Sequence, residues 1–174
     1  MTGFRRGTEA WYYQEAEPDT ATAFAVHNAR PVNQRWDQSF RYIIAEAATP
    51  TGEPIWYTEI LHVDGPPMDG TFERALFGVV IDPQRVEDCD ARHRNLPEAL
   101  RSALIEAGFR NFSAFRRGGH VMYYGECYPR LRVALASLAA TGLLSEWLEG
   151  LRGVVTRITE DGNPIVAREM FHQD

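Results

Sequence analysis

The sequence predicts an α+β protein, and three observations support that fold class. From residue 72 onward the segments alternate in the order strand, helix, strand, strand, helix, strand. One long stretch between two of these strands carries helical periodicity. The residues before 70 are rich in aromatic, strand-forming side chains. The βαββαβ order is that of the ferredoxin-like plan. We therefore expect a β-rich aromatic extension at 1–70 and a ferredoxin-like domain at 71–174.

Alternating and aromatic runs predict several strands in the first 70 residues. The expected strands are Thr8–Glu15, Thr22–Asn28, Ser39–Ala47 and its hairpin partner Pro54–Val63, with a loop over Pro31–Gln38. A turn-rich segment with two prolines, Asp64–Gly70, then marks the boundary between the two parts.

Three of the four tryptophans, Trp11, Trp36 and Trp56, lie in this extension. That many large aromatic residues argues against a disordered tail. Two interpretations remain open. The rings can form a small core or a sheet that packs on the second half. Alternatively they form an aromatic wall over a ligand, with Trp56 as a candidate substrate-binding residue.

The second half contains the better-defined elements. A buried strand is expected at Phe72–Ile81, and a proline starts the long helix at residue 83. The helix should break near Asn95–Glu98, where Pro97 follows a capping asparagine. The remaining predictions are a hairpin of strands Phe109–Arg116 and His120–Tyr128, helices at Pro129–Ala140 and Leu143–Leu151, and a last strand at Ile165–His172.

One face of the long helix is apolar except for His93. The apolar positions step by three or four residues: Val86, Cys89, Leu96, Leu100, Leu104 and Ala107. An imidazole in such a stripe points inward. It is either a core histidine with a hydrogen-bond partner or a group that moves protons in a cavity near neutral pH.

The stretch around His93 resembles the L-rhamnose mutarotase family. The spacing from His93 to Gly108 and on to Asn111–Phe112 is similar to the family pattern. Further matching segments are Val121–Cys127, Ser145–Leu148 and Val166–Phe171. The resemblance covers about residues 73 to 174. Cys89 stands where the family has a tyrosine, Pro97 where it has a tryptophan, and Leu148 where it has the second of two tryptophans.

The resemblance implies a dimeric α/β barrel, in which two such sheets pack face to face as a homodimer. It also implies a cofactor-independent isomerase that interconverts the anomers of a deoxyhexose. Ring opening needs one group to take the anomeric hydroxyl proton and another to protonate the ring oxygen. The candidate acid–base residues are His93 with Tyr124 or Glu126, and Tyr123 is an alternative partner. The candidate substrate-binding residues are Cys89, Arg92, Tyr123, Trp147 and Trp56.

Strand alternation leaves the orientation of the β-hairpin open. On the second hairpin strand, Tyr124 and Glu126 share one face, and Tyr123 and Cys127 share the other. Either face can line the core. Two further function classes also remain open. One is a cofactor-free cyclase, dehydratase or monooxygenase of a secondary-metabolite pathway, and the other is a ligand-binding module without catalysis.

Composition limits the partners that we expect. The 174 residues carry a net charge of −6, which argues against nucleic acid or an anionic membrane as the main partner. No apolar run approaches the roughly 20 residues that cross a bilayer, and no leader segment is recognised, so we expect a cytoplasmic protein. Cys89 and Cys127 form no CxxC pattern. No metal site, phosphate loop or cofactor motif is predicted.

Overall fold

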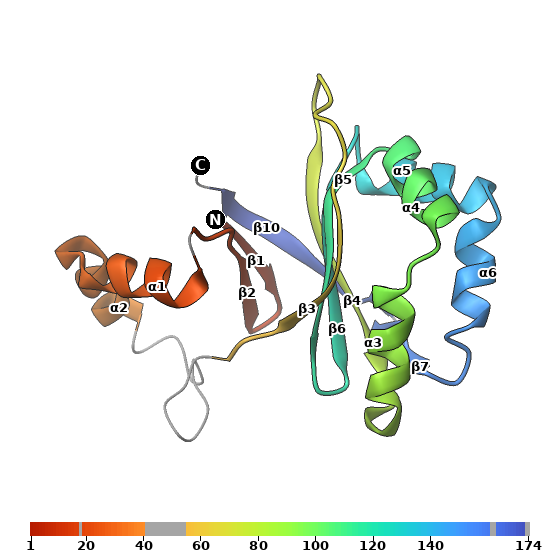
Figure 1. The fold of residues 1–174 in the computed structure, drawn as a ribbon. Helices are drawn as coiled ribbons and strands as arrows, with labels where there is room; N and C mark the ends of the chain where they lie inside the picture. Colours follow the sequence, from red (N-terminus) through yellow and green to blue (C-terminus); the bar gives the residue numbers. More distant parts are fainter. Residues whose placement is uncertain (18, 41–54, 161–162, 173–174) are drawn as a thin grey trace.

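The computed structural model describes residues 1–17, 19–40, 55–160 and 163–172. These residues form a mixed α+β fold built on one curled antiparallel sheet (Figure 1). The strand order is β2-β1-β10-β4-β6-β5-β3, and β7 pairs with β4 beside β10. The bounds are β1 Thr2–Arg6, β2 Glu9–Tyr13, β3 Thr58–Val63, β4 Glu73–Ile81, β5 Phe109–Arg117, β6 His120–Cys127, β7 Val155–Arg157 and β10 Val166–His172. The short strands β8 Thr159–Glu160 and β9 Asn163–Pro164 pair only with each other.

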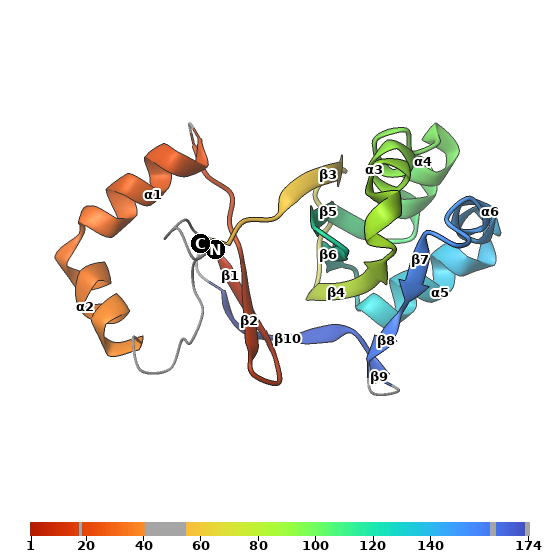
Figure 2. The same cartoon turned by 90° about the horizontal axis from the view of Figure 1, so that it is seen from below.

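Four helices cover one face of the sheet, α3 Val86–Arg94, α4 Glu98–Glu106, α5 Leu131–Ala140 and α6 Leu143–Glu149. They lie on one side of β4, β6 and β5 in both views (Figures 1 and 2). The predicted break in the long helix is confirmed. α3 ends at Arg94 and α4 begins after Pro97, whose ring cannot supply the backbone N–H that a continuous helix needs.

The helices of the N-terminal part correct two predictions. The expected strand Thr22–Asn28 lies in α1, Thr20–Ala29, and the expected loop Pro31–Gln38 lies in α2, Pro31–Phe40. The side chain of Asp19 caps α1 by accepting a hydrogen bond from the Thr22 backbone N–H at 2.8 Å. Such a cap, followed by alternating alanines, favours a helix over a strand.

The first 70 residues also contribute strands to the same sheet as the second half. β1 pairs with both β2 and β10, and β3 pairs with β5. β1 was not predicted, because its five residues carry no apolar alternation. The expected strand Ser39–Ala47 lies mostly outside the described residues, so its predicted hairpin with β3 is not observable.

Two separate apolar clusters lie on the two faces of the sheet. The helix-side core contains Ile81, Cys89, Leu104, Phe109 and Tyr123, together with other residues of α3 to α6. The opposite face, which we call the sheet face, is covered by the β1–β2 hairpin. Its buried residues are Phe4, Leu76, Met122, Tyr124 and Ala167, and Trp11, Tyr13, Tyr57 and Phe115 pack against them. The α1–α2 arm lies beyond that hairpin, away from the other helices (Figure 2).

Candidate functional site

His93 lies on α3 and points into the helix-side core. Its Nε2 is 2.9 Å from the Tyr123 hydroxyl, and its Nδ1 is 2.8 Å from the Cys89 backbone oxygen. A carbonyl can only accept, so Nδ1 carries the proton and Nε2 accepts from Tyr123. Both ring nitrogens are therefore occupied, and the side chain has no exposed surface. This geometry is that of a core histidine with satisfied hydrogen bonds.

Burial shifts the pKa values of His93, Cys89 and Tyr123 in the direction that favours their uncharged forms. It lowers the pKa of His93, against a smaller opposing effect of its hydrogen bond to Cys89 and of the nearby Asp90. Burial also raises the pKa of the Cys89 thiol to about 11 and raises that of the Tyr123 phenol. A thiol–imidazole pair with ionic character, which needs exposure and positive charge, is not favoured here.

Trp147 and Arg92 complete this cluster. The Trp147 ring meets the His93 ring edge-on, with centroids 5.0 Å apart. Arg92 donates to the backbone oxygen of Trp147 at 3.1 Å. The fold thus brings together five residues that were predicted as site residues: His93, Cys89, Arg92, Tyr123 and Trp147. They fill the space between α3, α6 and β6, and neither of two identified surface pockets is lined by any of them.

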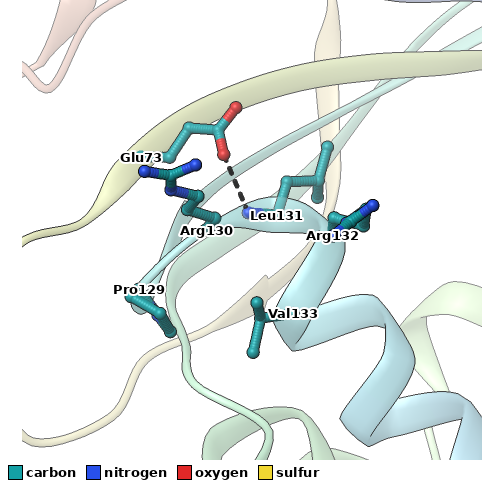
Figure 3. Close-up of a pocket in the computed structure, with 6 residues that line it drawn as sticks. All are labelled: Glu73, Pro129, Arg130, Leu131, Arg132 and Val133. Atoms are coloured by element: carbon teal, nitrogen blue, oxygen red, sulfur yellow. Dashed lines mark hydrogen bonds between the residues drawn. The ribbon is translucent and has the colours of Figure 1, made fainter.

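The larger of these pockets has a volume of about 530 Å³ and lies at the start of α5 (Figure 3). Glu73 from β4 reaches into it and accepts a hydrogen bond from the Leu131 backbone N–H at 3.0 Å. Arg130 and Arg132 on the rim are exposed. The Glu73 side chain therefore already occupies the N-terminus of α5, which is the end of the helix that attracts anions.

Tyr124 and Glu126 lie on the sheet face, on the opposite side of β6 from His93. The Tyr124 ring is 2% exposed and stacks on Tyr13 of β2, with centroids 3.7 Å apart. The Glu126 side chain is 22% exposed, and one of its oxygens is 3.8 Å from Nε of Arg74 on β4. The sheet therefore separates His93 from Tyr124 and Glu126, which cannot exchange protons with it directly.

The carboxyl of Glu126 holds its proton more tightly than an ordinary glutamate. Burial is the main cause of its raised pKa, and Glu15 and Asp64 add to the shift. Arg74 and His172 act in the opposite direction. Burial likewise raises the pKa of Tyr124 to about 12.

Arg74 is held in place but is not saturated. Its guanidinium lies over the Phe72 ring, 4.6 Å from the centroid. Its buried Nε finds no hydrogen-bond acceptor among the described residues. The arrangement places a buried guanidinium N–H beside a partly exposed carboxyl whose pKa is raised.

Three polar residues of the sheet face were not predicted as site residues. Tyr13 donates to Asn111 Oδ1 at 2.9 Å, and Asn111 donates to Glu15 at 2.6 Å. Asn111 has a φ of 47° beside a bulge in the β5–β6 pairing. Asparagine tolerates this left-handed backbone conformation better than most residues. The sequence does not show, however, that a bulge requires the conformation at this position.

Two of the three tryptophans of the N-terminal part have described side chains. Trp11 packs against the sheet face, and Trp56 is 49% exposed. The side chain of Trp36 lies outside the described residues. Within the described ranges, no group of three or more metal-ligating side chains occurs.

Among those same residues, no single helix is long and apolar enough to cross a membrane. Together α5 and α6 reach the required length and composition, but they are bent by 83° at the break between them. A scan of the chain against protein-family models found no match, and a search of curated proteins found none either. The resemblance to the mutarotases therefore depends on the motifs in this sequence.

Proposed function

We propose that the protein is a cofactor-independent acid–base enzyme that acts on a small polar ring compound, with a mutarotase-type reaction on a deoxyhexose as the favoured case. The observation that carries this proposal is the pair of Glu126 and Arg74 on the sheet face. A partly exposed carboxyl with a raised pKa lies beside a buried guanidinium N–H that has no acceptor among the described residues. Perturbed acids with a specific charged neighbour are typical of functional sites.

The strand order supports the ferredoxin-like part of the proposal. The four strands β10, β4, β6 and β5 are neighbours in that order, and helical pairs connect β4 to β5 and β6 to the last strands. A βαββαβ chain of ferredoxin-like plan places its first and third strands in the centre of the sheet. Here β4 and β6 have those places.

The chemistry assigns a different role to each side chain. Protonated Glu126 gives its proton to the ring oxygen while the bond from that oxygen to the anomeric carbon breaks. Arg74 holds a substrate oxygen through its N–H groups. A solvent water molecule takes the proton of the anomeric hydroxyl in the same step, and the open chain then rotates and closes on the other face. His93, the acid–base residue expected from the sequence, has a structural role in this scheme.

The test is anomeric exchange, measured by NMR on L-rhamnose and a panel of deoxysugars. We expect wild-type protein to accelerate exchange and Glu126→Gln to reduce the rate by about 100-fold or more, the usual effect of losing a general acid. Glu98→Gln removes a carboxyl that is 83% exposed on α4, beyond the helix-side core, and should keep the wild-type rate.

Equal rates in wild type and Glu126→Gln would contradict the assignment of Glu126. If no sugar exchanges faster with the protein than without it, the mutarotase reaction itself is excluded. Sugar-induced NMR shifts without acceleration would then favour a binding module.

The homodimer remains part of the proposal. A partner copy packed face to face would meet the β1–β2 hairpin, because Phe4 is fully buried on that side and Trp11 and Tyr13 pack beside it. Sedimentation velocity gives the oligomeric state, and a monomer at all concentrations would exclude the dimer.

A further inference from the structure

An aromatic pair lies beside the charged pair of the proposed site, and the reaction scheme leaves it unused. The rings of Phe72 and Tyr128 stack with centroids 5.0 Å apart and an angle of 29° between their planes. Phe72 comes two residues before Arg74 along the chain, and Tyr128 comes two residues after Glu126. Because side chains alternate along a strand, each ring lies on the same face as its charged neighbour.

The contacts between the two pairs are direct. Arg74 on β4 is the register partner of Glu126 on β6. Phe72 and Tyr128 lie beyond that pair, before the start of β4 and after the end of β6. The Arg74 guanidinium lies over the Phe72 ring, 4.6 Å from its centroid. Phe72 therefore contacts both Arg74 and Tyr128, which leaves more of the Tyr128 ring than of the Phe72 ring for a ligand.

All four side chains are within reach of solvent. The side chain of Arg74 is 18% exposed and that of Glu126 is 22% exposed. Phe72 and Tyr128 are half-buried. The Nε of Arg74 has no hydrogen-bond partner among the described residues. Accessible aromatic surface thus lies next to an unused hydrogen-bond donor and a carboxyl.

This combination suits a pyranose ring. Such a ring carries hydroxyl oxygens around its rim and apolar C–H groups on its faces. It therefore needs polar partners at the rim and a flat apolar surface against one face. Small-molecule sites commonly combine aromatic surface with a few polar groups that fix the orientation of the ligand.

We propose that Tyr128 is a substrate-binding residue whose ring packs against the apolar face of the sugar, and that Phe72 positions both Tyr128 and Arg74. This inference rests on the proposed function and adds the residues that recognise the body of the substrate. Phe72 acts through its two neighbours, because an aromatic ring attracts a guanidinium and stacks on a second ring.

The test measures KM and kcat of anomeric exchange separately, with L-rhamnose as the probe. A stacking contact is made equally in the ground state and the transition state, so Tyr128→Leu should raise KM roughly 3- to 10-fold and leave kcat unchanged. Tyr128→Phe keeps the ring and should keep the wild-type KM. Phe72→Leu should raise KM in the same way, and it tests the subsite even if Tyr128→Leu fails to fold.

The matched control is Tyr12→Leu, which removes a tyrosine ring from a residue of β2 that is 45% exposed. It should keep the wild-type KM. An NMR titration of the same proteins with L-rhamnose gives Kd without requiring turnover, and Kd should rise in the same variants as KM.

The two measurements separate the subsite from the reaction. Unchanged KM and Kd in the Tyr128→Leu and Phe72→Leu variants would overturn the subsite, while exchange that depends on Glu126 would leave the proposed function intact. Binding without exchange, weakened by Tyr128→Leu and not by Tyr12→Leu, would support the subsite and reject the reaction. A protein that neither binds nor converts L-rhamnose or any deoxysugar of the panel would overturn both.

Discussion

Tyr123 and Tyr124 are adjacent on β6, yet they belong to opposite environments. Tyr123 hydrogen-bonds His93 in the helix-side core, whereas Tyr124 stacks on Tyr13 on the sheet face. Around Tyr123 the phenol hydroxyl and both ring nitrogens of His93 have partners, but Arg92 Nε and Trp147 Nε1 in the same cluster have no hydrogen-bond partner among the described residues. Around Tyr124, Arg74 Nε likewise has none, and the difference is that the neighbouring Glu126 is partly exposed.

This difference shows that the residue type alone does not make a site. Histidine is the usual proton carrier near neutral pH, but burial lowers the pKa of His93, and both of its ring nitrogens are hydrogen-bonded inside the protein. In the proposed function a glutamate on the other face has that role, because burial raises its pKa while its side chain stays partly exposed.

The largest expected effect is a difference in the free energy of unfolding between variants on the two faces of the sheet. His93→Ala should lower the free energy of unfolding by about 3 kcal/mol, because it leaves a cavity and an unpaired Tyr123 hydroxyl. His172→Ala on the sheet face removes an exposed imidazole and should cost less than about 1 kcal/mol. Urea denaturation of both variants provides the comparison, and similar losses would contradict the structural role of His93.

The two tyrosines sharpen the same contrast. Tyr123→Phe should cost about 1 to 2 kcal/mol, since Nε2 of His93 loses its donor in a buried position. Tyr124→Phe should cost less, because Thr2 keeps its contact with His172. The measurement is again the midpoint and slope of denaturation. A larger loss for Tyr124→Phe would show that the sheet face is the more tightly packed side.

The pH dependence of stability isolates His93. Its pKa is lower in the folded protein than the unfolded value of 6.5, so the unfolded state binds the proton first. Stability is therefore complete above pH 6.5 and falls as the pH drops toward the folded pKa, by at most about 1.4 kcal/mol per pH unit.

The measurement is denaturation at pH 7.5, 6.5 and 5.5 in a Glu126→Gln background, with and without His93→Gln. The background matters because Glu126, whose pKa is raised, shifts stability in the opposite sense. A decline on acidification that persists in His93→Gln would assign it to another group.

The smallest expected effect concerns Asn111, whose side chain connects β5 to Tyr13 and Glu15 of the N-terminal part. Asn111→Ala places alanine at a φ of 47° and should cost about 1 kcal/mol. Asn111→Gly relieves the backbone but also loses the contacts to Tyr13 and Glu15, so it isolates those contacts and should cost a few tenths of a kcal/mol. Equal losses in the two variants would mean that the side-chain contacts, not the backbone, determine the effect.

Local pattern predicted most of the second half. The strand at 72–81, the hairpin around Gly118 and Gly119, and the helices at 129–140 and 143–151 all follow from alternation, periodicity and turn residues, and the structure confirms them within a few residues. The predicted break near Pro97 is confirmed for the same reason. The periodicity also placed His93 on a buried face, where the structure has it.

The candidate site was less predictable than the fold. The sequence selected Tyr124 and Glu126 as well as Tyr123, but strand alternation has two solutions and does not say which face the helices cover. Tyr13, Glu15 and Asn111 were missed. They come from the region of β2 and from a bulge in β5 about a hundred residues later, so no local spacing connects them.

The sequence by itself determined the order and approximate bounds of the main helices and strands of residues 72–172, because capping, proline and hydrophobic period act over a few residues. Only the tertiary structure decided which face of β6 meets the helices and that β1 joins β10. The helix α1 likewise replaced an expected strand, since strand propensity counts only where a partner strand is available. These outcomes depend on pairing between residues as far apart as Thr2 and His172, which no window of sequence contains.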